Sequence, residues 1–254
     1  MRVAVFASGS GGNCLLISDG DTNILVDAGI SMRRVVSALA GLGISMEKIG
    51  GVLITHEHSD HVSGLKMLEK HYHIPVFAPH TVANRLLGAY PELSDEMRII
   101  PVGEAFRIGS LTLRAFHTPH DTDESVGYRA EGGGVFAVAT DMGHVTDEVR
   151  EALSGADTVL IESNHDETML CDGPYPVWLK RRILSDHGHL SNENCARLAR
   201  ELWDSGTRRI ILGHLSRENN RPELAMACAR AALADTAAEL YCAPVSGCLC
   251  VEVG

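Results

Sequence analysis

The most constraining feature of this sequence is a run of metal-ligand residues directly after an apolar segment. Residues 51–54 have the composition of a strand leaving a hydrophobic core, and His56, His58, Asp60 and His61 follow them. Alternation along an extended backbone places His56 and His58 on one side, and a turn into a helix brings Asp60 and His61 round to a second position nearby. Imidazole and carboxylate groups suit zinc, manganese, iron and cobalt. The run therefore predicts a site for two metal ions at one strand end.

The same pattern, an apolar strand followed by a ligand-type residue, recurs along the chain. The strand ends are occupied by Asp27, Asp141, Glu162 and His214. Because open α/β layers collect a site from distant strand ends, we expect these side chains to meet near His56. Asp27 has two interpretations: it caps the helix that begins near Ser31, or it orients a metal-bound histidine.

Hydrophobic spacing and turn residues predict alternating strands and helices without an internal boundary. Strands are expected over residues 2–6, 13–18, 23–27, 51–54, 75–78, 135–139, 158–161, 209–212, 238–242 and 248–253, with several β segments in 98–116 around a hairpin at Gly109-Ser110. Helices are expected over residues 31–43, 62–72, 80–90, 145–154, 174–186 and 191–203 and from Pro222 onward. No linker, low-complexity tract or repeat is visible, so residues 1–254 are expected to form a single domain.

Composition narrows the class of protein. A net charge of −11 argues against indiscriminate binding to a polyanion, although metal ions and local arginines can reverse the field at one site. No run is long enough to span a membrane, and the N-terminal segment does not resemble a signal peptide. The 7 cysteines lie mostly in apolar runs, which is typical of buried thiols in a reducing compartment. We therefore expect a cytoplasmic protein without a membrane partner.

The ordered residues resemble the metallo-β-lactamase fold superfamily, whose hydrolases carry a His-x-His-x-Asp-His motif and later His, Asp and His ligands. The resemblance spans almost the whole chain and rests on Asp27, Thr55–His61, His120, Asp141 and His214. Motifs at Ala139–Asp141, at Ser125–Arg129 after His120 and at Gly213–Arg217 resemble the nuclease-like branch of that superfamily. Shorter motifs at Ser163–Asp166, Gly188–Asn192 and Leu215–Asn220 resemble, within that branch, the bacterial YycJ/WalJ exonuclease group. Cysteine, which common class B β-lactamases carry at the position of Asp141, is absent there.

The resemblance implies an αββα sandwich: two facing mixed β-sheets flanked by helices, with two divalent metal ions, Zn, Mn or Fe, at one edge. One ion would be held by His56, His58 and His120, and the other by Asp60, His61 and His214. Asp141 would bridge them. His117 competes with His120 for the third ligand position, and His120 is preferred because it directly precedes Asp121, as the family ligand does.

The resemblance further implies a phosphodiesterase that hydrolyses nucleic acid, most simply a DNA exonuclease in DNA repair, with a metal-bridging hydroxide as nucleophile. Asp60 and Asp141 are the alternative candidates to orient that hydroxide. His189, oriented by Glu162, is the candidate to protonate the leaving oxygen. The alternatives are that His189 caps a loop and that Glu162 ends a strand in solvent. The candidate substrate-binding residues are Asn164, His165, Asn192 and Arg217. 

Two questions stay open at the level of sequence. Lys180-Arg181-Arg182 either grips a polyanion or forms a solvated helix face. The rival function is a small-molecule metallohydrolase acting on a thioester, lactone or cyclic nucleotide, for which a closed apolar pocket would be expected. A metal-binding module without catalysis is disfavoured, because loss of catalysis would permit loss of individual ligands from the set.

Overall fold

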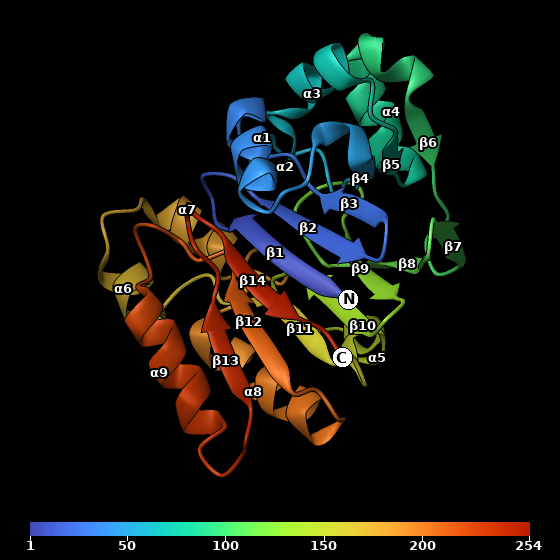
Figure 1. The fold of residues 1–254 in the computed structure, drawn as a ribbon. Helices are drawn as coiled ribbons and strands as arrows, with labels where there is room; N and C mark the ends of the chain where they lie inside the picture. Colours follow the sequence, from blue (N-terminus) through green and yellow to red (C-terminus); the bar gives the residue numbers. More distant parts are fainter.

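Two seven-stranded β-sheets face each other at the centre of the molecule (Figure 1). The computed structural model describes residues 1–254. The first sheet runs in the order β14 (Leu249–Glu252), β1 (Arg2–Ala7), β2 (Cys14–Asp19), β3 (Thr22–Val26), β4 (Ile49–Leu53), β5 (Val76–Ala78) and β6 (Met97–Ile99). The second runs in the order β13 (Glu239–Cys242), β12 (Arg209–Gly213), β11 (Thr158–Glu162), β10 (Val135–Ala139), β9 (Val126–Glu131), β8 (Leu111–His117) and β7 (Ala105–Ile108).

Both sheets mix antiparallel and parallel strands. Strands β14, β1, β2 and β3 pair antiparallel, whereas β3 to β6 pair parallel. In the second sheet β7 to β10 are antiparallel and β10 to β13 are parallel. Parallel neighbours end at the same edge, so the residues that follow β3 and β4, and those that follow β10, β11 and β12, are collected at one place.

Helices cover the outer face of each sheet. The first sheet is covered by α1 (Met32–Gly41), α2 (Ser59–Val62), α3 (Leu65–Tyr72) and α4 (His80–Ala89), and the second by α5 (Asp147–Leu153), α8 (Asn192–Asp204) and α9 (Pro222–Ala232) (Figure 1). Alternation within β1 shows the layering: Val3 and Val5 pack between the sheets, whereas Ala4 and Phe6 pack under the helices. The predicted αββα arrangement is confirmed.

The connections differ from the sequence prediction in two places. The helix expected over residues 62–72 begins only at Leu65, as α3, and is separate from α2, because the N–H of Gly64 donates to the carbonyl of Ala28 instead of to that of Asp60. The helix expected over 174–186 is limited to α7 (Val177–Ile183), since Pro176 is extended and forms its N-cap. A further helix, α6 (Glu167–Asp172), and two short 3-10 helices, Met46–Lys48 and Pro91–Asp95, were not predicted.

Two broader expectations can also be compared with the structure. Only Cys14 and Cys195 are buried, so the expectation that most cysteines are buried is wrong. Cys171 lies at the surface of α6, Cys250 on the edge strand β14 and Cys248 just before that strand, and all three are exposed. None of the helices has the length and apolar character needed to cross a membrane.

Candidate metal centre

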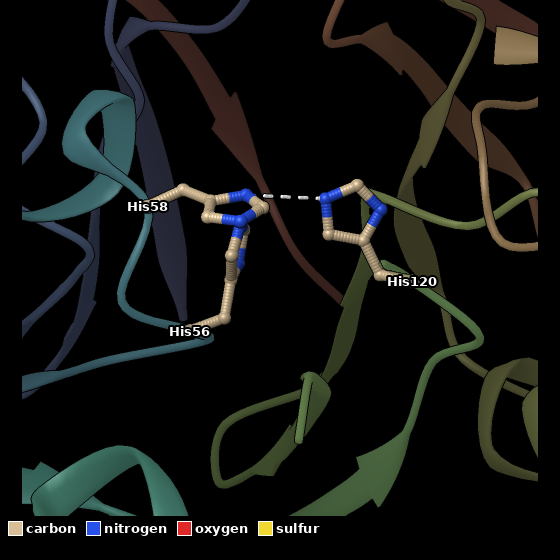
Figure 2. A group of neighbouring side chains, drawn as sticks. All are labelled: His56, His58 and His120. Carbon is tan, nitrogen blue, oxygen red and sulfur yellow. Dashed lines mark hydrogen bonds between the residues drawn. The ribbon is translucent and has the colours of Figure 1, made fainter. Parts of the chain in front are cut away.

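Three histidines from two separate segments meet at one end of the sandwich. His56 and His58 follow β4, and His120 lies in the loop after β8, with its ring facing theirs (Figure 2). The Nε2 atom of His120 is 3.3 Å from Nδ1 of His58, and the rings of His56 and His58 are 4.6 Å apart. The three residues offer nitrogen atoms that all lie within 4.8 Å of one another.

A second set of donors lies beside the first. Asp60 and His61 come from α2, and His214 follows β12. The Oδ2 atom of Asp60 is 3.5 Å from Nε2 of His61 and 3.5 Å from Nε2 of His214. Residues expected from the sequence to hold two different ions are therefore gathered into two adjacent groups.

Asp141 lies between the two sets. Its Oδ2 atom is 3.3 Å from Nε2 of His61, and its Oδ1 atom is 3.5 Å from Nε2 of His214. Oδ1 is also 3.8 Å from Nε2 of His120, which belongs to the first set. One carboxylate thus lies close to nitrogen atoms of both groups.

Unpartnered buried atoms indicate that these groups suit metal ions. The Nε2 atoms of His56 and His214 and the Oδ2 atom of Asp141 are buried without a hydrogen-bond partner. Leaving such atoms unsatisfied is costly, and coordination of a cation would satisfy them. A donor set of imidazole nitrogens and carboxylate oxygens is the kind that divalent transition metals take. The clusters are therefore suited to binding metal ions.

The electrostatics of the second set point the same way. Burial by itself raises the pKa of Asp141, but His214 and His61 outweigh it and hold the pKa well below its usual range. Burial likewise opposes a charge on His214, yet Asp141 and the neighbouring carboxylates of Asp60 and Glu162 raise the pKa of His214 to about 10. The carboxylates therefore stabilise positive charge here, which bound cations would supply.

Three residues at the ends of strands adopt left-handed backbone conformations. The φ angles are 59° at Asp27, 58° at Asp141 and 54° at His214. Such conformations cost a side-chain-bearing residue about 1–3 kcal/mol, and they tend to concentrate at functional sites. Each directs its side chain out of the strand direction and into the cluster.

The structure resolves the two interpretations of Asp27. Its Oδ2 atom is 2.7 Å from Nδ1 of His61, and its Oδ1 atom accepts a hydrogen bond of 2.9 Å from the backbone N–H of Thr55. Ser31 is the N-cap of α1, and its side chain makes no capping hydrogen bond. Asp27 therefore orients His61, so that Nε2 of that ring faces the cluster.

Glu162 is fully buried, which excludes the solvent-exposed alternative. Its Oε1 atom is 2.8 Å from Nδ1 of His214 and 2.7 Å from Nδ1 of His189, and its Oε2 atom accepts a hydrogen bond from the N–H of Met142. Burial raises the pKa of Glu162, but His189 and the hydrogen bonds lower it to about 2. One ionised carboxylate thus holds a candidate ligand and the candidate proton donor together.

His189 lies at the rim of the cluster. Its ring centre is 5.2 Å from that of His120 and 5.3 Å from that of His214. Burial lowers the pKa of His189, but Glu162 more than offsets this and raises it. Because Nδ1 is held by Glu162, Nε2 is the nitrogen left for another partner. His189 also lines a pocket of about 170 Å³ beside the cluster.

The structure separates the two competing histidines of the loop after β8. His120 is buried within the cluster. His117 is more than half exposed, and its Nδ1 atom lies 3.3 Å from Oε1 of Glu148. Its position at the end of β8 points it to solvent, so it is not part of the donor group.

Two of the four candidate substrate-binding residues need correction. Asn192 is buried: its Oδ1 atom accepts hydrogen bonds from Ser163 and Asn220, and its Nδ2 atom donates to Oδ1 of Asn220. His165 is only 1% exposed, because its backbone pairs with Ser191 and turns the side chain inward, and burial lowers its pKa to about 4. Neither side chain is available to a substrate.

The other two candidates differ in exposure: Asn164 is buried, with only 4% of its surface exposed, whereas Arg217 lies at the surface. Asn164 lines the pocket beside His189 and donates a hydrogen bond of 3.0 Å from Nδ2 to the carbonyl of His214. Arg217 is exposed, and its guanidinium group lies against Gly11 of the glycine-rich turn. This turn, residues 8–13, lies at the rim of the site: Ser10 lines the same pocket as His189, and Asn13 lies beside His61.

Sequence reasoning missed three supporting residues. Nδ2 of Asn13 lies 3.0 Å from Nε2 of His61, and Oγ of Ser8 accepts a hydrogen bond from the N–H of His214. Oγ1 of Thr55 lies 3.1 Å from Nδ1 of His56. Thr55 adjoins the histidine motif, which is a usable signal, whereas nothing local in the sequence marks Ser8 or Asn13.

Comparison with known proteins agrees with this architecture. Residues 22–215 match the Beta-lactamase superfamily domain. Exodeoxyribonuclease YycJ of Bacillus anthracis is 37% identical over 229 residues, covering 89% of this chain and 86% of that protein. Exodeoxyribonuclease WalJ of Streptococcus pneumoniae (serotype 2, strain D39) is 36% identical over 230 residues, covering 88% and 85%. The metallo-β-lactamase fold protein YhfI of Bacillus subtilis superimposes with a TM-score of 0.71 at 16% identity, covering 98% of this chain and 99% of that one, which is a likeness of fold.

The family match covers most of the chain, and the two exodeoxyribonucleases are similar over nearly all of it. Family, fold and donor chemistry agree on one class of enzyme. The chain belongs to the β-lactamase superfamily, in which it is a metal-dependent hydrolase of the metallo-β-lactamase fold.

Proposed function

We propose that the chain is a dinuclear-metal phosphodiesterase that hydrolyses nucleic acid, and that it acts on DNA as an exonuclease in DNA repair. The main support is the sharing of Asp141 between two adjacent donor sets, in a chain 37% identical to a protein named as an exodeoxyribonuclease. The cytoplasmic location expected from the sequence accompanies this proposal and stays a prediction.

The ligands follow from the two sets. His56, His58 and His120 would hold one divalent cation, Asp60, His61 and His214 the other, and Asp141 would face both. Zinc, manganese and iron all fit such donors. Two bound cations lower the pKa of a water molecule towards neutrality and stabilise charge on a phosphoryl oxygen.

The side chains of the protein divide the remaining tasks. Asp60 is partly exposed, so its carboxylate can accept a hydrogen bond from the attacking water and fix its direction. His189, held at Nδ1 by Glu162, would donate a proton from Nε2 to the leaving oxygen. Arg217, exposed beside the glycine-rich turn, would contact a phosphate of the substrate, and Asn164 would line the wall of the pocket.

The decisive experiment uses purified protein with added Mn²⁺ or Zn²⁺ and DNA or RNA labelled at the 5′ or 3′ end. Stepwise release of mononucleotides from DNA ends would support the proposal, and the position of the label would give the polarity. Cleavage at internal sites would replace the exonuclease assignment with an endonuclease. Turnover of thioesters, lactones or cyclic nucleotides, with all nucleic acids intact, would instead favour the small-molecule hydrolase.

A further inference from the structure

Helix α7 exposes an apolar and basic surface to solvent. Val177 and Trp178 are 64% and 65% exposed, and Leu184 directly after the helix is 49% exposed. Arg181 lies one helical turn after Val177 and Trp178 and is also exposed. We call these four residues the α7 surface. Exposed apolar side chains gathered in one segment, rather than scattered singly, mark an interaction site.

A pocket lies between α7 and the candidate metal centre, although none of the four residues of the α7 surface lines it. The cavity of about 170 Å³ is lined on one side by Tyr175, Leu179 and Arg182 from α7 and the segment before it. Its other walls include His189, the proposed proton donor, and Ser216. Trp178 lies one helical turn before Arg182 on α7, so a chain-like ligand with one end at His189 that leaves the pocket past Arg182 reaches Trp178.

Positive charge flanks the same path. Arg181 has no carboxylate partner, and Arg182 pairs with Asp121, the neighbour of His120. Arg217, also without a carboxylate partner, lies beside the pocket wall formed by Ser10 and Ser216. In a chain with a net charge of −11, these arginines provide local complementarity to a polyanion.

We propose that the α7 surface binds the single strand of nucleic acid that extends beyond the phosphodiester under attack, with a base stacked on Trp178 and phosphate groups at Arg181 and Arg217. This inference rests on the proposed nuclease function. Aromatic faces next to cationic side chains are the usual means of holding a single strand without reading its sequence. The strand is the occupant that the exposed arginines favour, because its phosphate groups are complementary to them in charge.

Kinetics with two substrates test the assignment. An oligothymidylate reaches α7, whereas bis(p-nitrophenyl) phosphate offers no strand to bind. In Trp178→Ala the KM for the oligothymidylate should rise by roughly 5- to 100-fold with little change in kcat, the range expected for loss of one stacked base. The ratio of kcat/KM for the two substrates should fall by the same factor. Trp178→Phe should recover most of this loss, because a phenyl ring still stacks.

Fluorescence gives a second readout that does not require turnover. Trp178 and Trp203 are the chain's 2 tryptophans, and Trp203 packs under Arg208. In Trp203→Phe, emission therefore reports Trp178 alone, and a phosphorothioate-linked oligothymidylate should quench it. An abasic strand of equal length should bind through its phosphates and quench much less. Trp203→Phe by itself is the matched control and should keep the wild-type KM.

The outcomes separate the inference from the function on which it rests. Unchanged KM and unquenched emission, in an enzyme that still degrades DNA, would overturn the role of α7 and leave the nuclease in place. Hydrolysis of the small diester without any action on nucleic acid would overturn the proposed function itself. Self-association of the wild-type chain that is lost in Trp178→Ala would assign the surface to a second copy and would overturn the inference.

Discussion

His61 and His214 each have one ring nitrogen within hydrogen-bond distance of a buried carboxylate. The rings of His56, His58 and His120 have no buried carboxylate on the nitrogen that points away from the cluster. Asp27 is 2.7 Å from His61, and Glu162 is 2.8 Å from His214. Behind the other set there are only a threonine hydroxyl at His56 and the carbonyl of Gly188, 3.4 Å from Nδ1 of His120. 

A carboxylate on the outer nitrogen fixes the tautomer of a histidine and raises its basicity. The set of Asp60, His61 and His214 is therefore held in a geometry ready for a cation before any cation arrives. The set of His56, His58 and His120 depends more on the cation itself to order it, and His58 is partly exposed. Two adjacent sites that share Asp141 therefore need not bind a cation with equal affinity.

The largest effect is expected at Asp141, the carboxylate that the two sets share. Asp141→Asn keeps the size of the side chain and suits the left-handed backbone, but removes the charge that faces both sets. Metal content should fall, and turnover should drop by more than about 100-fold. That loss exceeds the range of about 10- to 100-fold that is usual for residues that only hydrogen-bond to a metal ligand. Elemental analysis and steady-state kinetics measure both. Near-normal turnover with full metal content would contradict the role of Asp141.

The sequence indicated which side chains meet, because strand ends that carry ligand-type residues were visible at Asp27, Asp141, Glu162 and His214. What it could not indicate is what each side chain contacts. Asn192 carries the same polar group as a substrate-binding amide, yet it pairs with Asn220, which lies far away in the sequence. 

Backbone strain is equally hidden from the sequence. Asp27, Asp141 and His214 share a left-handed backbone conformation. The residues next to them in the sequence do not predict it, because surrounding tertiary contacts impose it. The interruption of the helix at Gly64 has a similar origin: the N–H of Gly64 donates to the carbonyl of Ala28, distant in the chain, and the carbonyl of Ile30 leaves no room for a side chain there. Periodicity predicts elements well, but it carries no information about such close approaches.

The next largest effect is expected from removing His189, one of the two histidines that Glu162 contacts. His189→Ala leaves the contact between Glu162 and His214 in place, so metal binding should persist while DNA turnover falls by about 10²- to 10⁴-fold, as for loss of a general acid. Bis(p-nitrophenyl) phosphate should be much less affected, because its leaving group departs without a proton. An equal loss with both substrates would argue that His189 positions the site instead of donating a proton.

Changes behind the supported set should have an intermediate effect. Asp27→Asn and Glu162→Gln should each lower metal affinity or activity by about 10- to 100-fold, since the outer carboxylate on a ligand histidine is lost. Glu162→Gln should also reduce proton donation, because Glu162 holds His189 as well. Competition with a chromophoric chelator and kinetics with the two substrates measure the two consequences.

A matched control for these variants exists outside the cluster. Glu148→Gln makes the same chemical change beside His117, a histidine exposed to solvent. It should leave metal affinity and turnover at wild-type values. A loss comparable to that of Glu162→Gln would mean that the effect of removing a glutamate is general, and that burial behind a ligand does not explain it.

The smallest expected effect tests the order in which the two sets release their cations. His58→Ala removes the partly exposed donor of the unsupported set, so this variant should retain one cation, held by Asp60, His61 and His214 with Asp141. If the carboxylate behind His61 strengthens that remaining cation, adding Asp27→Asn should weaken it by about tenfold, whereas adding Glu148→Gln should not. Chelator competition on the single and double variants measures the affinity directly. Retention of the cation with equal affinity in both double variants would show that Asp27 contributes no binding strength, and the contrast between the two sets would then have to rest on Glu162 and on the charge of Asp60.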